Sequence, residues 1–362
     1  MGVATRSVAA GAARPSSARW AATFRRPAVL SVGSLALLLL VVVAGTALGS
    51  VSVPFDQTAA LLARRLLGLP IPVTWPASAE TIVFDLRLPR VLTAMVVGAG
   101  LAVAGATLQG VLRNPLADPY VLGTASGAAL GAAIGILIPF RLLFLDFGLV
   151  HILAFGGAVI AVLTVERLSR RGTLASLTGL LLTGYAVGSL LAAGLAVVMY
   201  ASGQSLRQIF SYLLGSFDGA SWLRLAVAAP IIVAGVVLLT VRSRALDAFL
   251  LGDDGAAHLG VDVPRERTIL LVLAALVTAA GVAVSGLIGF VGLVVPHAVR
   301  VVLGPNARAV VPASVVVGAA FLGLADLGAR LAGEVPIGVI TALVGGPFFL
   351  WLLGRTRAGY EL

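Results

Sequence analysis

Apolar runs long enough to cross a membrane recur along nearly the whole 362-residue chain, and short polar stretches separate them. An uninterrupted apolar run of about 18 residues or more is typical of a transmembrane helix. In lipid the backbone must satisfy its own hydrogen bonds, so we predict an all-α, polytopic membrane protein with about ten transmembrane helices. The expected spans are Ala28–Gly49, Val91–Leu112, Val121–Ile138, Gly148–Val165, Leu174–Met199, Leu223–Val241, Ile269–Ser285, Leu287–Leu303, Ala309–Leu331 and Ile337–Leu353.

Two stretches depart from this regular pattern. Ile269–Leu303 holds two spans in 35 residues, with Gly286 and Gly289 at the break and Pro296 beyond, so one of the two helices must be short. Leu206–Gly219 is half-apolar and predicts a short helix at the membrane surface. Transporters often build their pathway from such interrupted helices, although glycine and proline are also frequent in ordinary membrane helices.

The distribution of arginine predicts the orientation of the chain. Residues 1–27 are rich in arginine, alanine and serine and predict a disordered cytoplasmic tail ahead of a ten-helix domain at residues 28–355. The first apolar run exceeds the 7–15 residues of a signal-peptide core, which favours an uncleaved helix. In the ten-helix arrangement 17 arginines fall on the inner side and 8 on the outer side. We therefore expect a plasma (inner) membrane protein with both termini in the cytoplasm.

Composition removes several classes of function. The chain is 59% hydrophobic and 11% charged, and its 25 basic residues are all arginine. Without lysine it carries neither a phosphate-binding P-loop nor a Schiff base, and without cysteine it forms no disulfide or thiolate site. Orientation in a membrane explains the net charge of +10 better than nucleic acid does. The three histidines lie on different segments, so we predict no metal site, no cofactor and no enzymatic activity in this chain.

The spans are nearly free of ionisable residues, which bears on the energy source. Proton-driven carriers normally relay protons through buried carboxylates or histidines. The nearest candidates, Asp326 and Glu334, fall close to the outer ends of their segments. The energy source is therefore expected in another protein, while sodium coupling through carbonyls and hydroxyls stays open.

A polar island of about two dozen residues, 242–267, stands between two apolar runs. It is too long for a bare turn between membrane helices, so it has structure of its own or a partner. An ordinary solvated loop is the alternative interpretation. Our hypothesis is that the island lies in the cytoplasm, docks a soluble motor and passes its movement to the flanking helices.

Within the polar island we predict two short helices. The first covers Leu246–Leu251, a Gly-Asp-Asp-Gly turn follows, and the second covers Ala256–Leu259. Asp253 or Asp254 would cap the second helix. Gly260 would end it in the left-handed conformation that glycine adopts without strain.

Three arginines on the outer side run against the usual charge bias. Arg87 and Arg90 stand three residues apart where a helix is expected to begin, with Pro89 suited to its first turn. Arg330 lies near the outer end of a later span. We predict a docking site for acidic residues of a soluble extracytoplasmic partner, with snorkelling to lipid phosphates as the alternative.

A set of polar residues and prolines gathers at the inner ends of two spans. Asn114 and Asp118, each followed by proline, fit the starts of turns. This inner-end motif comprises Gln109, Arg113, Asn114, Pro115, Pro119, Pro296 and His297.

Together these motifs resemble the permease subunits of bacterial ABC importers for iron–siderophores, haem and vitamin B12, the type II importers. The resemblance covers about residues 30–355. The matching segments are RLPRVLTAMVVGAGLAVAGATLQGVLRNPLADPYVLGTASGAALGA at 87–132, LLGSFDGASW at 213–222, LGDDGAAHLGV at 251–261, SGLIGFVGLVVPHAVR at 285–300, ADLGARL at 325–331 and EVPIGVITALVGGPFFLWLL at 334–353.

The resemblance implies a vitamin B12-importer-like bundle of ten helices and a set of partners. These are a second permease subunit, identical or not, two cytoplasmic ATPase subunits, an extracytoplasmic binding protein and membrane lipid, with no nucleic acid. It implies that Arg87, Arg90 and Arg330 face glutamates of the binding protein. It also implies an ATPase-coupling role for Leu251, Gly252, Asp253, Asp254, Ala256, Leu259 and Gly260.

Three functions follow in order of preference. The first is the permease of an ATP-driven importer that translocates an iron–siderophore. The second is the same kind of permease for cobalamin or haem. The third is a secondary carrier that works without an ATPase.

Overall fold

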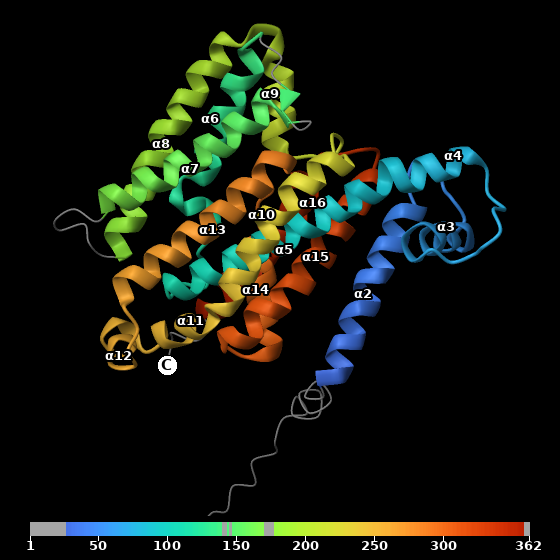
Figure 1. Ribbon diagram of the computed structural model, residues 1–362. Helices are drawn as coiled ribbons and strands as arrows, with labels where there is room; N and C mark the ends of the chain where they lie inside the picture. The colour runs from blue at the N-terminus through green and yellow to red at the C-terminus, as the bar shows by residue number, and fades with distance from the viewer. Residues whose placement is uncertain (1–26, 140–142, 145–146, 170–176, 358–362) are drawn as a thin grey trace, which may run out of the picture.

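The computed structural model describes residues 27–139, 143–144, 147–169 and 177–357, and the predicted tail, but for Pro27, lies outside them. Helices account for almost all of this part of the chain (Figure 1). The α-helices are α2 (Pro27–Ala47), α3 (Phe55–Leu67), α4 (Ala77–Glu80), α5 (Leu88–Val111), α6 (Thr124–Leu137), α7 (Leu149–Ser169), α8 (Leu177–Ala201), α9 (Leu206–Leu214), α10 (Trp222–Val241), α11 (Ser243–Phe249), α12 (Gly252–His258), α13 (Val263–Ser285), α14 (Val291–Leu303), α15 (Ala307–Leu331) and α16 (Ile337–Arg357).

Shorter elements complete the described chain. A π-helical segment, η1, covers Thr81–Arg87, and two 3-10 helices, η2 and η4, cover Pro119–Leu122 and Gly203–Ser205. Strands β1 (Leu143–Phe144) and β2 (Phe147–Gly148) form an antiparallel hairpin before α7, in which Leu143 pairs with Gly148.

Each of the ten predicted spans corresponds to one apolar helix of the described chain. Six helical stretches are long and apolar enough to cross a membrane, and four shorter apolar helices accompany them. The break predicted within Ile269–Leu303 is confirmed, because α13 ends at Ser285 and α14 has only 13 residues. Gly286 leaves α13 with a φ of +68°, which glycine adopts without strain. The short helix predicted within Leu206–Gly219 is α9.

The central element of the bundle is α5, which is buried along nearly its whole length between α10, α13, α14 and α15. Glycines let its neighbours approach closely. A Cβ on Gly98 would lie 2.3 Å from the carbonyl oxygen of Gly318 in α15, and a Cβ on Gly105 would lie 1.9 Å from that of Gly292 in α14. Such small-residue crossings are how membrane helices gain van der Waals contact, since burial between helices yields no hydrophobic gain over lipid.

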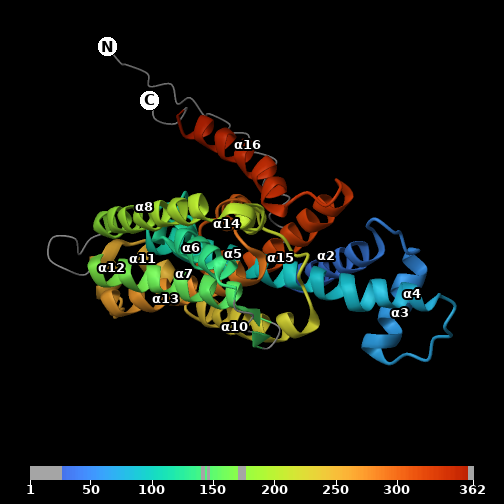
Figure 2. The same cartoon turned by 90° about the horizontal axis from the view of Figure 1, so that it is seen from above.

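The bundle has two ends with different polar structures (Figure 1). The end that carries Arg87, Arg90 and Arg330, where α2 and α15 finish, is called the arginine end. The end that carries α11 and α12 is called the island end; α5 and α10 finish there. The start of α2 lies towards the island end (Figure 1), and α16 begins beside α9, where a Cβ on Gly338 would lie 2.4 Å from the oxygen of Leu214. Figure 2 shows α16 standing away from the other helices.

The α-helix α5 begins at Leu88 with Pro89 in its first turn, as predicted, but Arg87 itself belongs to helical backbone that starts earlier. Helical backbone runs from Ala77 to Val111, and the π segment Thr81–Arg87 lies directly before Pro89. Proline has no N–H for the carbonyl four residues earlier, and its ring clashes with that carbonyl. The wider π turn accommodates Pro89 inside a continuous helix, where π bulges commonly occur.

Candidate coupling and docking sites

The polar island folds as two short helices at the island end, as predicted, but its Gly-Asp-Asp-Gly sequence is not a turn. It forms the first turn of α12, which begins at Gly252, and neither Asp253 nor Asp254 caps it. The first helix is α11, Ser243–Phe249, which starts three residues earlier than Leu246. Gly260 has a φ of +82°, so the predicted left-handed termination is confirmed.

Asp253 makes ion pairs instead of a cap. Its Oδ1 accepts a hydrogen bond from Arg113 Nη2 at 2.9 Å, and both of its oxygens accept from Arg267 Nη2 at 2.8 Å. Arg113 follows α5 and Arg267 lies in the second turn of α13. Arg113 has a φ of +48°, a conformation that costs a non-glycine residue about 1–3 kcal/mol and persists where its surroundings hold it. Asp253 therefore joins α12 to two membrane helices.

Two further carboxylates fasten the polar island to the bundle. Asp247 of α11 accepts a hydrogen bond from the backbone N–H of Ala307 at 2.6 Å, so it satisfies a donor in the first turn of α15. Glu266 pairs with Arg242 at 2.6 Å and ties the end of α10 to the start of α13. These contacts connect α11 and α12 to α5, α13 and α15.

The inner-end motif brings Gln109 of α5 to the proline of α14. Pro296 has no N–H for the carbonyl of Gly292, four residues before it. Gln109 Nε2 donates to that oxygen at 3.0 Å and to the oxygen of Leu293 at 3.3 Å. Arg300 in turn donates to Gln109 Oε1. The glutamine replaces the hydrogen bond that the proline removes, which explains why both residues belong to one motif.

The remaining motif residues shape the connection from α5 to α6. Asn114 Oδ1 accepts from Leu116 N, and Asp118 Oδ1 accepts from Tyr120 N, both at 2.9 Å, which confirms the two predicted turn starts. Removal from water raises the pKa of the Asp118 carboxyl to about 6, and its hydrogen bond from Tyr120 opposes that rise.

The other three members of the motif lie apart from these hydrogen bonds. Pro119 contacts α14, since a Cβ on Gly292 would lie 2.8 Å from Pro119 Cδ. Pro115 is exposed. His297 makes an edge-to-face contact with Phe348 of α16, with ring centroids 5.7 Å apart.

At the arginine end, two of the three predicted docking arginines are buried and donate to the backbone where α2 finishes. The last four carbonyls of a helix have no partner within the helix. Arg87 Nη1 donates to the oxygens of Thr46 and Ala47 at 3.1 and 3.0 Å. Arg330 Nη2 donates to that of Gly45 at 2.7 Å. Arg87 and Arg330 therefore cap α2 and fix it against α5 and α15.

Arg90 has a different environment, because its guanidinium meets three carboxylates. Its Nε donates to the buried Asp326 at 2.9 Å, and its Nη1 lies 2.7 Å from Asp218 and 3.5 Å from Glu334. Asp326 also pairs with Arg330 at 3.1 Å. The side chains of Asp218 and Glu334 are 66% and 51% exposed, so these two partners face solvent.

The sequence analysis did not predict several of the ion-pair and hydrogen-bond partners of these site residues. The i, i+4 spacing of Asp326 and Arg330 on one helix was an available signal for their ion pair. Asp218, Arg267 and Arg300 carried no comparable signal, because each meets a residue more than ten positions away along the chain.

A membrane bundle of ten apolar helices, with a helix pair fastened at one end, is the arrangement expected of a transport permease. Comparison with known proteins agrees. Residues 37–355 match the FecCD transport family, and the chain belongs to that family. It is thus a permease of the bacterial ABC importers for iron–siderophores, haem and vitamin B12, a multi-pass protein of the inner membrane.

The chain is similar to several proteins over most of its length. It is 42% identical to the cobalamin import system permease protein of Halobacterium salinarum, over 78% of this chain and 76% of that one. It is 40% identical to the hemin transport system permease protein of Yersinia pestis, over 91% and 96%. A metal-chelate type ABC transporter solved in an inward-facing conformation superposes with a TM-score of 0.76 at 31% identity, over 91% and 99%.

Proposed function

We propose that this permease translocates an iron–siderophore complex that an extracytoplasmic binding protein delivers and a cytoplasmic ATPase drives. The observation that carries the proposal is membership of the FecCD family together with the likeness to a metal-chelate type transporter. The relatives named for cobalamin and hemin make the same permease for cobalamin or haem the second candidate.

The cargo is tested by reconstitution in vesicles with the cognate ATPase and binding protein. Labelled ferric siderophore, haem and cobalamin are offered in turn, and the ligand retained by the purified binding protein is identified. We expect ATP-dependent uptake of the siderophore alone. Uptake of cobalamin or haem instead would establish the second candidate, and uptake without the ATPase would establish a secondary carrier.

For coupling, we propose that residues 242–267 lie in the cytoplasm and that α12 enters a cleft on the ATPase. Leu251 and Leu259 flank α12 and are exposed, so they offer an apolar contact to a partner. The Asp253 ion pairs then carry the movement of α12 to α5 and α13. ATP chemistry belongs to the partner, and this chain opens and closes a largely uncharged passage.

We expect Asp253→Asn to lower cargo imported per ATP hydrolysed by about five-fold or more while the ATPase stays bound. The change keeps side-chain size but removes the charge that Arg113 and Arg267 face, and a partly buried charged hydrogen bond contributes about 1.5–3 kcal/mol. Uptake and ATPase rates are measured in the same vesicles. Asp56→Asn on α3 is the control, since that carboxylate is exposed and lies outside the polar island. Equal coupling ratios in the two variants would contradict the role.

For docking, we propose that acidic residues of the binding protein engage the arginine end at Arg87, Arg90 and Arg330. Of these, Arg90 is nearest to solvent-facing groups, so an incoming carboxylate would replace Asp218 or Glu334 beside it. Replacing Arg87 or Arg330 by glutamate would instead place a carboxylate against the carbonyls of α2 and is expected to impair folding.

Two substitutions that are expected to change the affinity for the binding protein in opposite directions test this docking mode. Arg90→Gln is expected to weaken binding of the binding protein about two- to five-fold, because an exposed ion pair contributes about 0.2–1 kcal/mol. Asp218→Asn is expected to strengthen it by a similar factor, since a competing carboxylate is removed. Affinities are measured on protein in nanodiscs, with Arg207→Gln, an exposed arginine of α9, as control. Weaker binding in both variants would rule out the exchange.

A second permease subunit is proposed to cover α8 and α16. Large apolar side chains of both helices are exposed, among them Leu190 of α8 and Leu350 of α16. Both helices lie on the upper side of the bundle in Figure 2. The passage would then form between the two subunits, as a homo- or heterodimer.

A further inference from the structure

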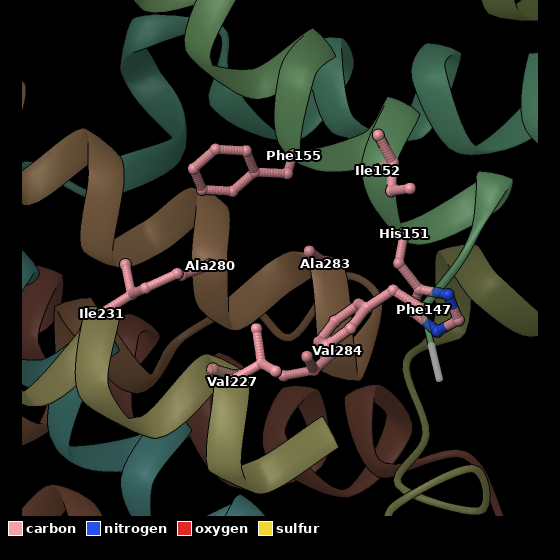
Figure 3. Close-up of a pocket in the computed structure, with 10 residues that line it drawn as sticks. Phe147, His151, Ile152, Phe155, Val227, Ile231, Ala280, Ala283 and Val284 are labelled. Atoms are coloured by element: carbon pink, nitrogen blue, oxygen red, sulfur yellow. The ribbon is translucent and has the colours of Figure 1, made fainter. Parts of the chain in front are cut away.

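A groove runs between α7 and α10 at the arginine end, and α13 forms its floor. Both walls pack against α13, whose small side chains leave a cavity of about 190 Å³ (Figure 3). Ile152 and Ile231 remain 38% and 43% exposed, so the groove opens sideways from the bundle. The apolar side chains that line the groove include Ile152 and Phe155 from α7, Val227 and Ile231 from α10, and Ala280 and Ala283 from α13.

The upper end of this groove continues into a second, polar cavity of about 350 Å³. The two cavities share His151, Ala283 and Val284. The polar cavity adds Arg224 from the first turn of α10 and the hydroxyl and amide groups of Ser211 and Gln208 on α9. Among the described residues its acidic lining residue is Asp218, which pairs with Arg90 at 2.7 Å. Arg224 Nη1 also donates a hydrogen bond to the oxygen of Gly219 at 2.6 Å.

The depth and chemistry of the two cavities define their occupant. The apolar lining belongs to the first turns of α7 and α10 and the last turns of α13, so it reaches from one membrane surface partway into the bilayer core. Water needs two or more polar partners to occupy a cavity, and apart from His151 the described lining of this groove is apolar. A hydrocarbon chain is complementary to this apolar groove, and a phosphate at its end is complementary to Arg224 and to the hydroxyl and amide donors.

We propose that this groove is a binding site for one anionic glycerophospholipid of the leaflet at the arginine end. One acyl chain lies between α7 and α10 on Ala280 and Ala283, and the phosphate sits beside Arg224. The lipid joins the α6–α7 side of the bundle to α10 over the floor of α13. The proposed lipid site requires only that the chain lies in a membrane, and it does not depend on which cargo the permease carries.

Retained lipid and lipid-dependent stability test the site. Detergent-purified protein is analysed by native mass spectrometry, and its melting temperature is followed as phosphatidylglycerol is added. We expect one phospholipid adduct and a saturable rise in melting temperature. Ala283→Phe fills the floor of the groove and is expected to lose the adduct. Arg224→Gln is expected to raise the phosphatidylglycerol concentration for half-maximal stabilisation about tenfold, since it removes a charged hydrogen-bond donor.

The control is Leu238→Phe, an exposed position on α10 near the island end, which should bind lipid as the wild type does. If Ala283→Phe fails to fold, Arg224→Gln decides the outcome by itself. Wild-type protein without an adduct, or an unchanged phosphatidylglycerol response in Arg224→Gln, would overturn the proposal.

Discussion

Gly105→Ala is expected to remove most of the correctly assembled protein from the membrane. A Cβ at this position would lie 1.9 Å from the carbonyl oxygen of Gly292 and 2.4 Å from its Cα, which are backbone atoms that no rotamer change can move. The crossing of α5 and α14 would have to open, and the Gln109 bond to Gly292 one turn away would be lost with it. Overpacking of this kind costs about 1–3 kcal/mol or more, a large part of a marginal stability.

The measurement for Gly105→Ala is the monodisperse fraction in detergent and the melting temperature of what remains. Gly328→Ala on α15 is the matched control, because nothing lies within 4 Å of its added Cβ. It should be neutral or slightly stabilising, as alanine favours a helix over glycine. A Gly105→Ala protein that melts with the wild type would show that α5 and α14 are not held in this contact.

Asp326→Asn is expected to destabilise the protein by about 3 kcal/mol, because it leaves the buried Arg330 guanidinium without the carboxylate that pairs with it. Both carboxylate oxygens of Asp326 accept hydrogen bonds, one from Arg90 and one from Arg330, and its side chain is almost wholly buried. An asparagine keeps one acceptor and turns an N–H₂ group towards an arginine. Weaker positioning of Arg330 would also release the end of α2.

Thermal unfolding in detergent at constant salt measures the Asp326→Asn effect. Glu334→Gln is the control, since that carboxylate lies 3.5 Å from Arg90 and is half exposed. It should change stability by no more than about 1 kcal/mol. Equal effects of the two substitutions would mean that solvent screens Asp326 as fully as Glu334.

Local features of the sequence predicted the elements well. The ten spans, the short α14 and the left-handed end at Gly260 follow from apolar length and from glycine chemistry, which act within a few residues. The same local reasoning misread the sequence Gly252–Gly255 as a turn. Its glycines and aspartates favour turns by propensity, but the pairing of Asp253 with Arg113 and Arg267 holds it as helix.

The roles of the polar residues depended on the tertiary structure. Arg87 and Arg330 are charges on the outer side in the sequence, yet they cap α2 across 40 or more positions of chain. Gln109 of α5 donates a hydrogen bond to the carbonyl of Gly292 in α14, which Pro296 leaves without a backbone donor. The sequence by itself determined how many helices cross the membrane and which segment stands apart from them, because lipid imposes that pattern residue by residue. Only the folded bundle decided which arginine meets which carboxylate, because many partners are equally allowed until packing brings distant helices together.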